Sequence, residues 1–161
     1  MEIDVLIDEE FERRLEASWL QKIAQQVLFA QGISSNAELS LVITSQESMQ
    51  ELNRKYRGKD KPTDVLAFAM LPAEKEETEA IPFVTAPDGV LHLGEVIISY
   101  PQAVIQAEEH GHSVKREITI LLIHGVLHLL GYEHNKPELE REMRARESEI
   151  LSRIEGDISL D

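Results

Sequence analysis

Residues 113–130 form a segment whose apolar side chains would point to nearly every side of a helix. A helix of this kind is stable only when other elements surround it. No apolar stretch of the chain approaches the length of a membrane span, so this helix is expected in the middle of a globular fold. Its apolar positions are Ile118, Ile120, Leu121, Leu122, Ile123, Val126, Leu127 and Leu129. The sequence therefore predicts a central buried helix.

The rest of the chain alternates between strand-like and helix-like hydrophobic periodicity. Strands are expected at residues 3–7, 39–43, 64–70 and 90–99. Further helices are expected from Phe11 to Gln31, from the capping pair Thr44 and Glu47 to Gly58, from the capping pair Ser99 and Gln102 to Gly111, and onward from Pro137. This order predicts a small mixed sheet with helices around the buried one, in either an α+β or an α/β fold.

Length and composition predict a single domain over residues 1–161, because a chain of this size with 42% hydrophobic residues buries one core. Residues 72–89 are acidic and contain three prolines, so a surface loop is expected there. The first residues are acidic where a signal peptide would be basic and then apolar. The expectation is a soluble, cytoplasmic protein without a membrane partner.

The sequence HGVLHLLGYEH at residues 124–134 contains three histidines. His124 and His128 are four residues apart on the buried helix, so both imidazoles project from one face. Gly131 can turn the chain in the left-handed conformation and return His134 to that face. The chain has no cysteine, so histidine and carboxylate must hold any transition metal. Three histidines predict a zinc site with one open position, which is typical of catalytic sites.

Each of these histidines alone could be an ordinary core or surface residue. Together they would place polar rings on an apolar helix, which is costly unless an ion binds them. Zinc is expected, although nickel, cobalt and copper also bind histidine sites. His110 and His112, at a helix junction, and His92, in a strand pattern, are expected to be surface or capping residues, with His92 a candidate to support a ligand.

The histidine spacing equals that of the metzincin proteases, but Gly125 stands where those enzymes carry the glutamate that serves as general base. A metalloprotease is therefore an alternative function, although the chain lacks the glutamate that such an enzyme uses as general base. Glu133, next to the third histidine, could act on a water molecule or orient a ligand.

The formal net charge of −14 argues against a nucleic-acid partner, because phosphate binding needs a basic surface. Residues 54–61, RKYRGKDK, are the exception, with five basic residues against the single Asp60. Taken alone, this segment is typical of a solvated helix end.

The motif HGVLHLLGYEH, together with NRKYRGKDKPTDVLAFAM at residues 53–70 and LGEVIIS at residues 93–99, resembles the YbeY family of bacterial ribosomal-RNA maturation endoribonucleases. The resemblance runs from Asn53 through the helix that carries Met143 and Glu147. It implies an α+β fold, with a small mixed sheet of about four strands, about five helices and metal ligands on the central helix. Glu133, Glu95 and Ala67 stand where the family usually has aspartate, aspartate and serine.

The resemblance implies a cytoplasmic bacterial enzyme with zinc on His124, His128 and His134. Its substrate would be single-stranded RNA and not DNA. Its role would be maturation of the 3′ end of 16S rRNA and ribosome quality control, with the ribosome or ribosomal proteins as partners. The family's Tyr-Arg motif places the arginine that is important for activity at Arg57.

Arg57 is then expected to grip a phosphate with its planar guanidinium and to offset charge in the transition state. Lys59 and Lys61 would be auxiliary contacts to the RNA backbone. Zinc would polarise the phosphate or activate water, and either water or the ribose 2′-hydroxyl could attack. Besides the protease, a non-catalytic ribosome-associated factor with a structural zinc is an alternative.

Overall fold

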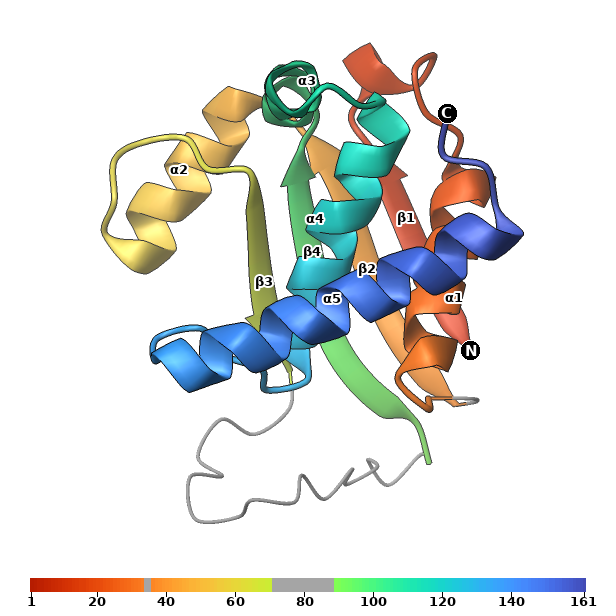
Figure 1. Ribbon diagram of the computed structural model, residues 1–161. Coiled ribbons are helices and arrows are strands. Elements are labelled where there is room, and N and C mark those ends of the chain that lie inside the picture. The colour runs from red at the N-terminus through yellow and green to blue at the C-terminus, as the bar shows by residue number, and fades with distance from the viewer. Residues whose placement is uncertain (34–35, 71–88) are drawn as a thin grey trace.

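The computed structural model describes residues 1–33, 36–70 and 89–161, and the loop expected at 72–89 lies outside them apart from Gly89. Four strands form one mixed sheet in the order β1-β2-β4-β3 (Figure 1). β1 and β4 run parallel to β2, whereas β3 is antiparallel to β4 and lies at an edge. The strands are β1 (Glu2–Ile7), β2 (Ala37–Thr44), β3 (Val65–Ala69) and β4 (Leu91–Ser99). This architecture confirms the predicted α+β fold with a mixed sheet.

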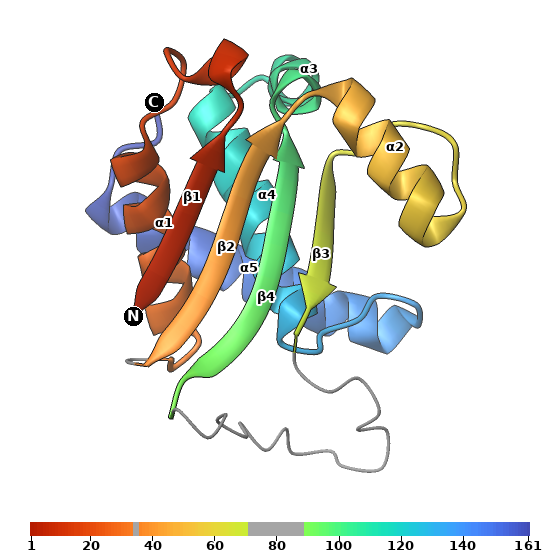
Figure 2. The ribbon, with the colours of Figure 1, turned by 180° about the vertical axis from the view of Figure 1, so that it is seen from behind.

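The helices are divided unequally between the two faces of the sheet (Figure 2). α1 (Ala17–Ala30), α4 (Val114–Leu129) and α5 (Pro137–Asp157) lie on one face. α2 (Gln46–Arg57) lies on the other face, beside β3 and β4. α3 (Tyr100–His110) follows β4 directly and lies at the carboxyl ends of β2 and β4. Within the described ranges, no helix is long and apolar enough to cross a membrane.

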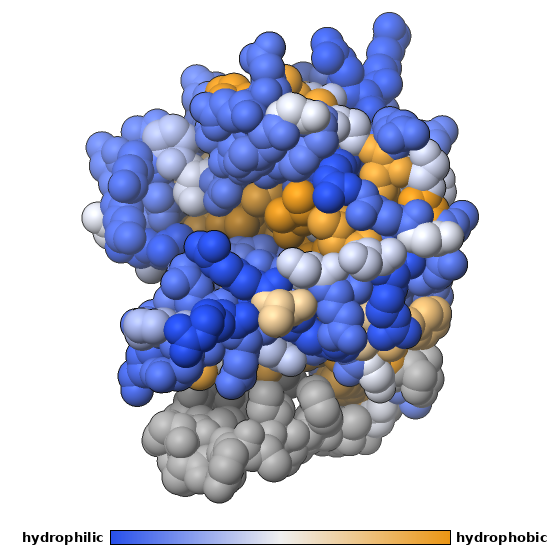
Figure 3. All heavy atoms as spheres, viewed as in Figure 1, coloured by the Kyte–Doolittle hydropathy of each residue, from blue (hydrophilic) through white to orange (hydrophobic). Residues whose placement is uncertain are grey.

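α4 is the central helix of the core, as its sequence predicts. The sheet lies against one side of it, and α1, α3 and α5 pack on its other sides. Ser113 begins the helix by accepting a hydrogen bond from the backbone N–H of Arg116 at 3.0 Å. From the helical side, the surface is mostly hydrophilic, with an apolar band visible between α3 and α5 (Figure 3). Most of the helix is covered by its neighbours, since ten of its sixteen residues are buried.

The first helix begins later than the periodicity predicts. Phe11 lies in a short 3₁₀ helix, η1 (Glu9–Phe11), and α1 begins at Ala17 after an extended Glu16. The Phe11 ring is buried because it stacks on the ring of Tyr100, with 5.0 Å between centroids. The apolar spacing at this point therefore reflects a bend that covers the core and not a continuous helix.

The cap of α2 also differs by one residue from the prediction. Ser45 caps the helix, and its Oγ accepts a hydrogen bond from the N–H of Ser48 at 3.2 Å. Thr44 is not available for this role because its Oγ1 donates to Asp8 Oδ2 at 2.6 Å. A contact between distant parts of the chain has moved the cap.

The other helix boundaries confirm the predicted signals. Ser99 Oγ accepts a hydrogen bond from the N–H of Gln102 at 3.2 Å at the start of α3. Gly58 and Gly111 end α2 and α3 in the left-handed conformation, which glycine adopts without strain. Pro137 occupies the first turn of α5, where its missing N–H is not needed.

Gly125 allows α4 to approach the sheet closely. A Cβ atom at this position would lie 2.7 Å from Val96 Cγ1 of β4 and 3.4 Å from Val65 Cγ2 of β3. Val96 is fully buried, so its side chain has little room to move away. The close approach sets how deep the carboxyl half of α4 sits against β3 and β4.

We expect Gly125→Ala to lower the free energy of unfolding by about 1–3 kcal/mol relative to a matched control, because the added methyl group overpacks the interface with Val96. The control is Gly156→Ala in α5, where an added Cβ meets nothing within 4 Å. Both substitutions add a methyl group to a helical glycine, but only the one at Gly125 meets the sheet. Chemical denaturation measures the difference, and equal midpoints for the two variants would contradict the close packing.

Candidate metal centre

Three imidazole rings meet at the carboxyl end of α4. His124 and His128 project from its last turns, and His134 lies in the segment before α5. The ring centroids are 4.6, 5.0 and 5.7 Å apart. One nitrogen of each ring lies within 4.8 Å of the others. The structure thus brings together the three histidines that the sequence predicts as metal ligands.

A tight turn after α4 returns the chain to this face. Gly131 has a φ of 99°, a conformation in which a side chain would be strained. Its N–H donates to the carbonyl oxygen of His128, and the N–H of Tyr132 donates to that of Leu127, each at 3.0 Å. These two bonds close the helix and direct His134 toward the other rings.

The positions of the nitrogens fit a transition-metal ion. Nε2 of His124 and Nε2 of His128 are 3.1 Å apart. Two nitrogens bound to one tetrahedral zinc ion, at about 2.0–2.1 Å each, lie roughly 3.3 Å from one another. Burial, followed by the nearby charges of His124 and His134, lowers the pKa of His128 to about 4. Near neutral pH this ring is uncharged and offers a lone pair, so the group could hold a metal ion with one position open.

Glu147 of α5 supports the site, and the sequence analysis did not identify it. Its Oε2 lies 2.6 Å from Nδ1 of His124. A neutral imidazole that donates from Nδ1 keeps its lone pair on Nε2, which is the nitrogen that faces His128. The carboxylate therefore fixes both the tautomer and the orientation of the first histidine.

A sequence signal for this glutamate does exist. Met143, Ile150 and Ile154 are the buried residues of α5, and Glu147 follows the first by four positions and precedes the second by three. It therefore lies on the apolar face of an amphipathic helix. A carboxylate in such a place is rare unless it has a partner, so its position indicates a contact in the interior.

The sequence suggested two other residues, Glu133 and His92, as supports of the site. Glu133 is exposed, and within the described part of the chain no hydrogen bond or ion pair joins it to the three histidines. His92 is on β4, where its Nδ1 lies 2.7 Å from Oε1 of Glu38 on β2. The role of Glu133 stays a prediction, and His92 belongs to the sheet.

The basic residues Arg57, Lys59 and Lys61 are exposed at the carboxyl end of α2 and just beyond it. The buried Asn53 donates from Nδ2 to the carbonyl oxygen of Lys61 at 2.9 Å, which folds this segment back against the helix. The end of α2 and the start of α5 lie on the same side of the molecule (Figure 1), with an indented surface between them (Figure 3). The edge strand β3 lies between the basic segment and the helix that carries the histidines.

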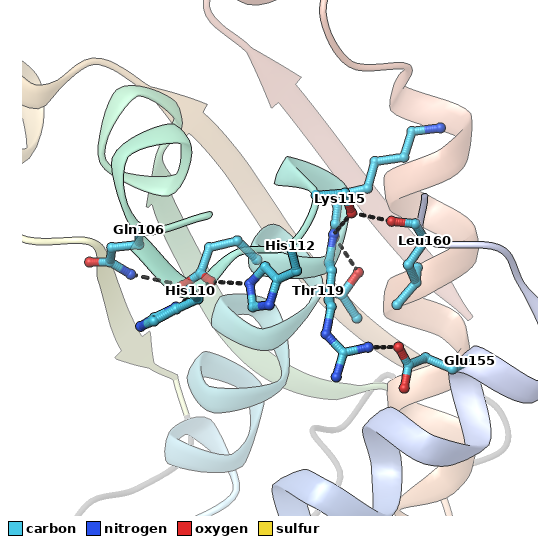
Figure 4. A network of polar contacts seen from close by, with 10 residues as sticks. Gln106, His110, His112, Lys115, Thr119, Glu155 and Leu160 are labelled. Atoms are coloured by element: carbon cyan, nitrogen blue, oxygen red, sulfur yellow. Dashed lines mark hydrogen bonds and ion pairs between the residues drawn. The ribbon is translucent and has the colours of Figure 1, made fainter. Parts of the chain in front are cut away.

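His110 and His112 are not simple surface histidines, because both contact Glu117 in the first turn of α4. Glu117 is only 2% exposed, and its Oε1 lies 3.0 Å from Nδ1 of His110 and 2.6 Å from Nε2 of His112. Gln106 donates to its Oε2 at 2.9 Å. Figure 4 shows Gln106, His110 and His112 converging on the start of α4. Burial raises the pKa of Glu117, but the hydrogen bonds from these three residues outweigh it and lower the pKa below its usual value.

The Glu117 group has metal-ligand spacing as well, but hydrogen bonds explain its geometry better. The 2.6 Å between Nε2 of His112 and Oε1 of Glu117 is shorter than the roughly 3.3 Å that separates two ligands of a tetrahedral ion. It matches a charge-assisted hydrogen bond. We assign this group to fastening the start of α4, at the end opposite the three histidines.

Comparison with known proteins agrees with the predicted family. A family model described as endoribonuclease YbeY matches residues 4–155. A relative from Dehalococcoides mccartyi, named endoribonuclease YbeY, is 50% identical over 155 residues, which cover 96% of this chain and 90% of the relative. A relative of the same name from Bacillus licheniformis is 43% identical, over 83% of this chain and 82% of its own.

A solved structure supports the fold independently. The solution structure of a protein from Thermotoga maritima is similar with a TM-score of 0.57, over 99% of this chain and 95% of that chain, at 23% identity. The similarity shows a shared fold. Since the family model spans most of the sequence and the relatives cover nearly all of it, the chain belongs to the endoribonuclease YbeY family of hydrolytic enzymes.

Proposed function

We propose that this chain is a zinc-dependent, cytoplasmic endoribonuclease whose single domain cleaves single-stranded RNA. Its substrate would be ribosomal RNA, in maturation of the 3′ end of 16S rRNA and in ribosome quality control, with the ribosome as partner. The observation that carries the proposal is the group of three histidines with an orienting carboxylate, in a chain of the endoribonuclease YbeY family.

In this proposal His124, His128 and His134 would hold the ion. Zinc supplies positive charge that polarises a phosphate and acidifies water. Glu147 accepts a hydrogen bond from Nδ1–H of His124, which orients the ring so that its Nε2 faces the ion. Arg57 offers a planar, bidentate donor to the phosphate and offsets the charge that develops on it. Lys59 and Lys61 bind neighbouring phosphates, and a 2′,3′-cyclic phosphate product would identify the ribose hydroxyl as the attacking group.

The protease alternative is weakened by the environment of Gly125. A metzincin-type base would have to reach the ion from this position. Here a side chain would meet Val96 and Val65 in the core. A glutamate would be buried against the sheet, where an unpaired carboxylate is strongly unfavourable. The alternative of a purely structural zinc is weakened because structural sites have four protein ligands, and the group found in the described residues has three.

We expect the purified wild type to cleave a labelled single-stranded RNA. Arg57→Ala should lower kcat by about 10²- to 10³-fold, because one donor to the developing charge is lost. Its metal content should stay at the wild-type level. His124→Ala should lose both metal and activity.

The matched control is Arg153→Ala, which removes an arginine from the far end of α5 and should cleave like the wild type. Casein cleavage, assayed on the same preparations, tests the protease alternative. Equal RNA cleavage by all four proteins would indicate a contaminating nuclease and would remove support for the proposal.

The contact between Glu147 and His124 predicts a loss of metal affinity in Glu147→Gln. The amide keeps the size of the side chain but cannot accept the Nδ1 proton as strongly, so affinity should fall about 10- to 100-fold. Competition with a chromophoric chelator measures it. Glu149→Gln is the control, because Glu149 lies on the same helix but pairs with Arg146. Equal zinc affinity in both variants would mean that Glu147 has no part in the site.

The two lysines predict a change in salt dependence. Each phosphate contact to a single strand contributes about −0.7 to the slope of log K against log salt concentration. The double variant Lys59→Ala/Lys61→Ala should therefore bind RNA with a slope shallower by roughly 1.4. Lys22→Ala on α1, an exposed lysine outside the basic segment, should leave the slope unchanged. Fluorescence anisotropy across a salt series gives both values, and parallel lines for all three proteins would exclude the lysines as phosphate contacts.

A further inference from the structure

Tyr56 is a large ring that the fold leaves exposed. Its exposed fraction is 58%, although it lies in the last turn of α2, between Lys55 and Arg57. A single exposed apolar side chain is common on protein surfaces, so its surroundings decide whether it marks a contact site. The charged residues of the segment 54–61 are all positive except Asp60, whereas the acidic Glu95 pairs with Phe68 in the sheet. The ring therefore lies within the basic segment and not beside it.

A contact with the sheet holds the Tyr56 ring in place. It meets Phe68 of β3 edge to face, with 5.4 Å between centroids and 65° between planes. Phe68 in turn packs against the small apolar cluster of Met49, Leu66 and Ile97. Lys55 Nζ lies 5.3 Å from the centre of the Tyr56 ring. Since one edge is fixed against the sheet and most of the ring is open, little conformational entropy is lost when a flat ligand stacks on it.

β3 connects this ring to the histidines. Phe68 faces α2, whereas Val65 approaches Gly125 on the opposite face, next to His124. β3 is also the edge strand of the sheet. A strand of RNA that passes around this edge would run from the Tyr56 ring toward the histidine group.

We propose that Tyr56 is a stacking platform for one unpaired base of the RNA, a short distance along the strand from the cleaved phosphate. The inference rests on the proposed function and extends it from phosphate to base. Aromatic side chains stack on any base without regard to sequence, and flanking cations hold the backbone. A base inside a duplex already stacks on its neighbours and does not offer its face. Tyr56 thereby supplies a preference for single strands, which the phosphate contacts cannot supply.

The positive charge of residues 54–61 favours single-stranded RNA as the ligand over a protein partner. The chain as a whole carries a net charge of −14, while residues 54–61 carry five basic residues and one acidic residue. A ligand that covers Tyr56 must satisfy these cations as well as the ring. Single-stranded RNA does both along its length, because it alternates phosphates with flat bases.

The experiment uses the wild-type protein with its metal and a single-stranded oligoribonucleotide that carries 2-aminopurine at each position in turn. Stopped-flow mixing records fluorescence in the binding phase, before cleavage. We expect quenching at one position, retained in Tyr56→Phe and lost in Tyr56→Leu, which keeps bulk but has no π face. The KM for single-stranded RNA should rise about 5- to 150-fold in Tyr56→Leu, with kcat nearly unchanged.

Two controls make the result specific. Phe29→Leu removes another exposed ring, 43% accessible on α1, and should change nothing. The wild type and Tyr56→Leu should bind a blunt RNA duplex equally well. Because only the binding of single strands weakens, the preference for single strands should be lower in Tyr56→Leu. Thermal melting confirms that the variants are folded, as expected for an exposed position.

The outcomes separate this inference from the proposed function. Quenching and KM in Tyr56→Leu equal to the wild type, with cleavage intact, would overturn the platform and leave the nuclease. If Tyr56→Phe lost as much fluorescence quenching as Tyr56→Leu, the effect would belong to the hydroxyl group, and this result would overturn stacking. Quenching that depends on the ring, without cleavage in any preparation, would support the platform and refute the nuclease. Absence of RNA binding by the wild type would overturn the platform.

Discussion

The burial of α4 is the constraint on which the other elements depend. An all-round apolar helix needs neighbours on every side, and the sheet, α1, α3 and α5 provide them. Burial is also the main cause of the low pKa of His128. Polar rings in such a place need partners, which either the protein or an ion supplies. Glu147 is the partner from the protein, and the three converging ring nitrogens could bind an ion as the second partner.

The opposite end of α4 is fastened by polar contacts. Glu117 accepts from Gln106, whose own Oε1 accepts from Gln102 at 3.1 Å, and Gln102 accepts from Gln46 at 2.9 Å. This chain of amides joins the first turns of α4 and α2 through α3. The proposed phosphate-binding residues and the three histidines lie at or just beyond the carboxyl ends of α2 and α4, opposite these joined amino ends. α2 has only two buried residues, Met49 and Asn53, so these bonds add to a small apolar contact with the sheet.

The sequence predicts most of the fold and the histidine group because both depend on local patterns. Periodicity and capping residues locate the elements, and the spacing of His124 and His128 needs only a helix. The errors arise where distant residues intervene. Thr44 donates to Asp8 and therefore does not cap α2. Phe11 stacks on Tyr100 and lies outside α1. Glu147 and the partners of Glu117 require knowledge of which helices pack together, and the sequence alone does not give that.

The contrast between net charge and local charge determines how an acidic protein can hold RNA. At physiological salt, charges farther apart than about 8 Å are largely screened, so under the proposed function the basic residues at 54–61 would act on RNA locally despite the −14 of the whole chain. Repulsion beyond this segment limits how much affinity phosphate contacts can supply. A contribution that does not depend on charge would add to this limited affinity. The exposed ring of Tyr56, set among these cations, is the group in this segment that can supply it.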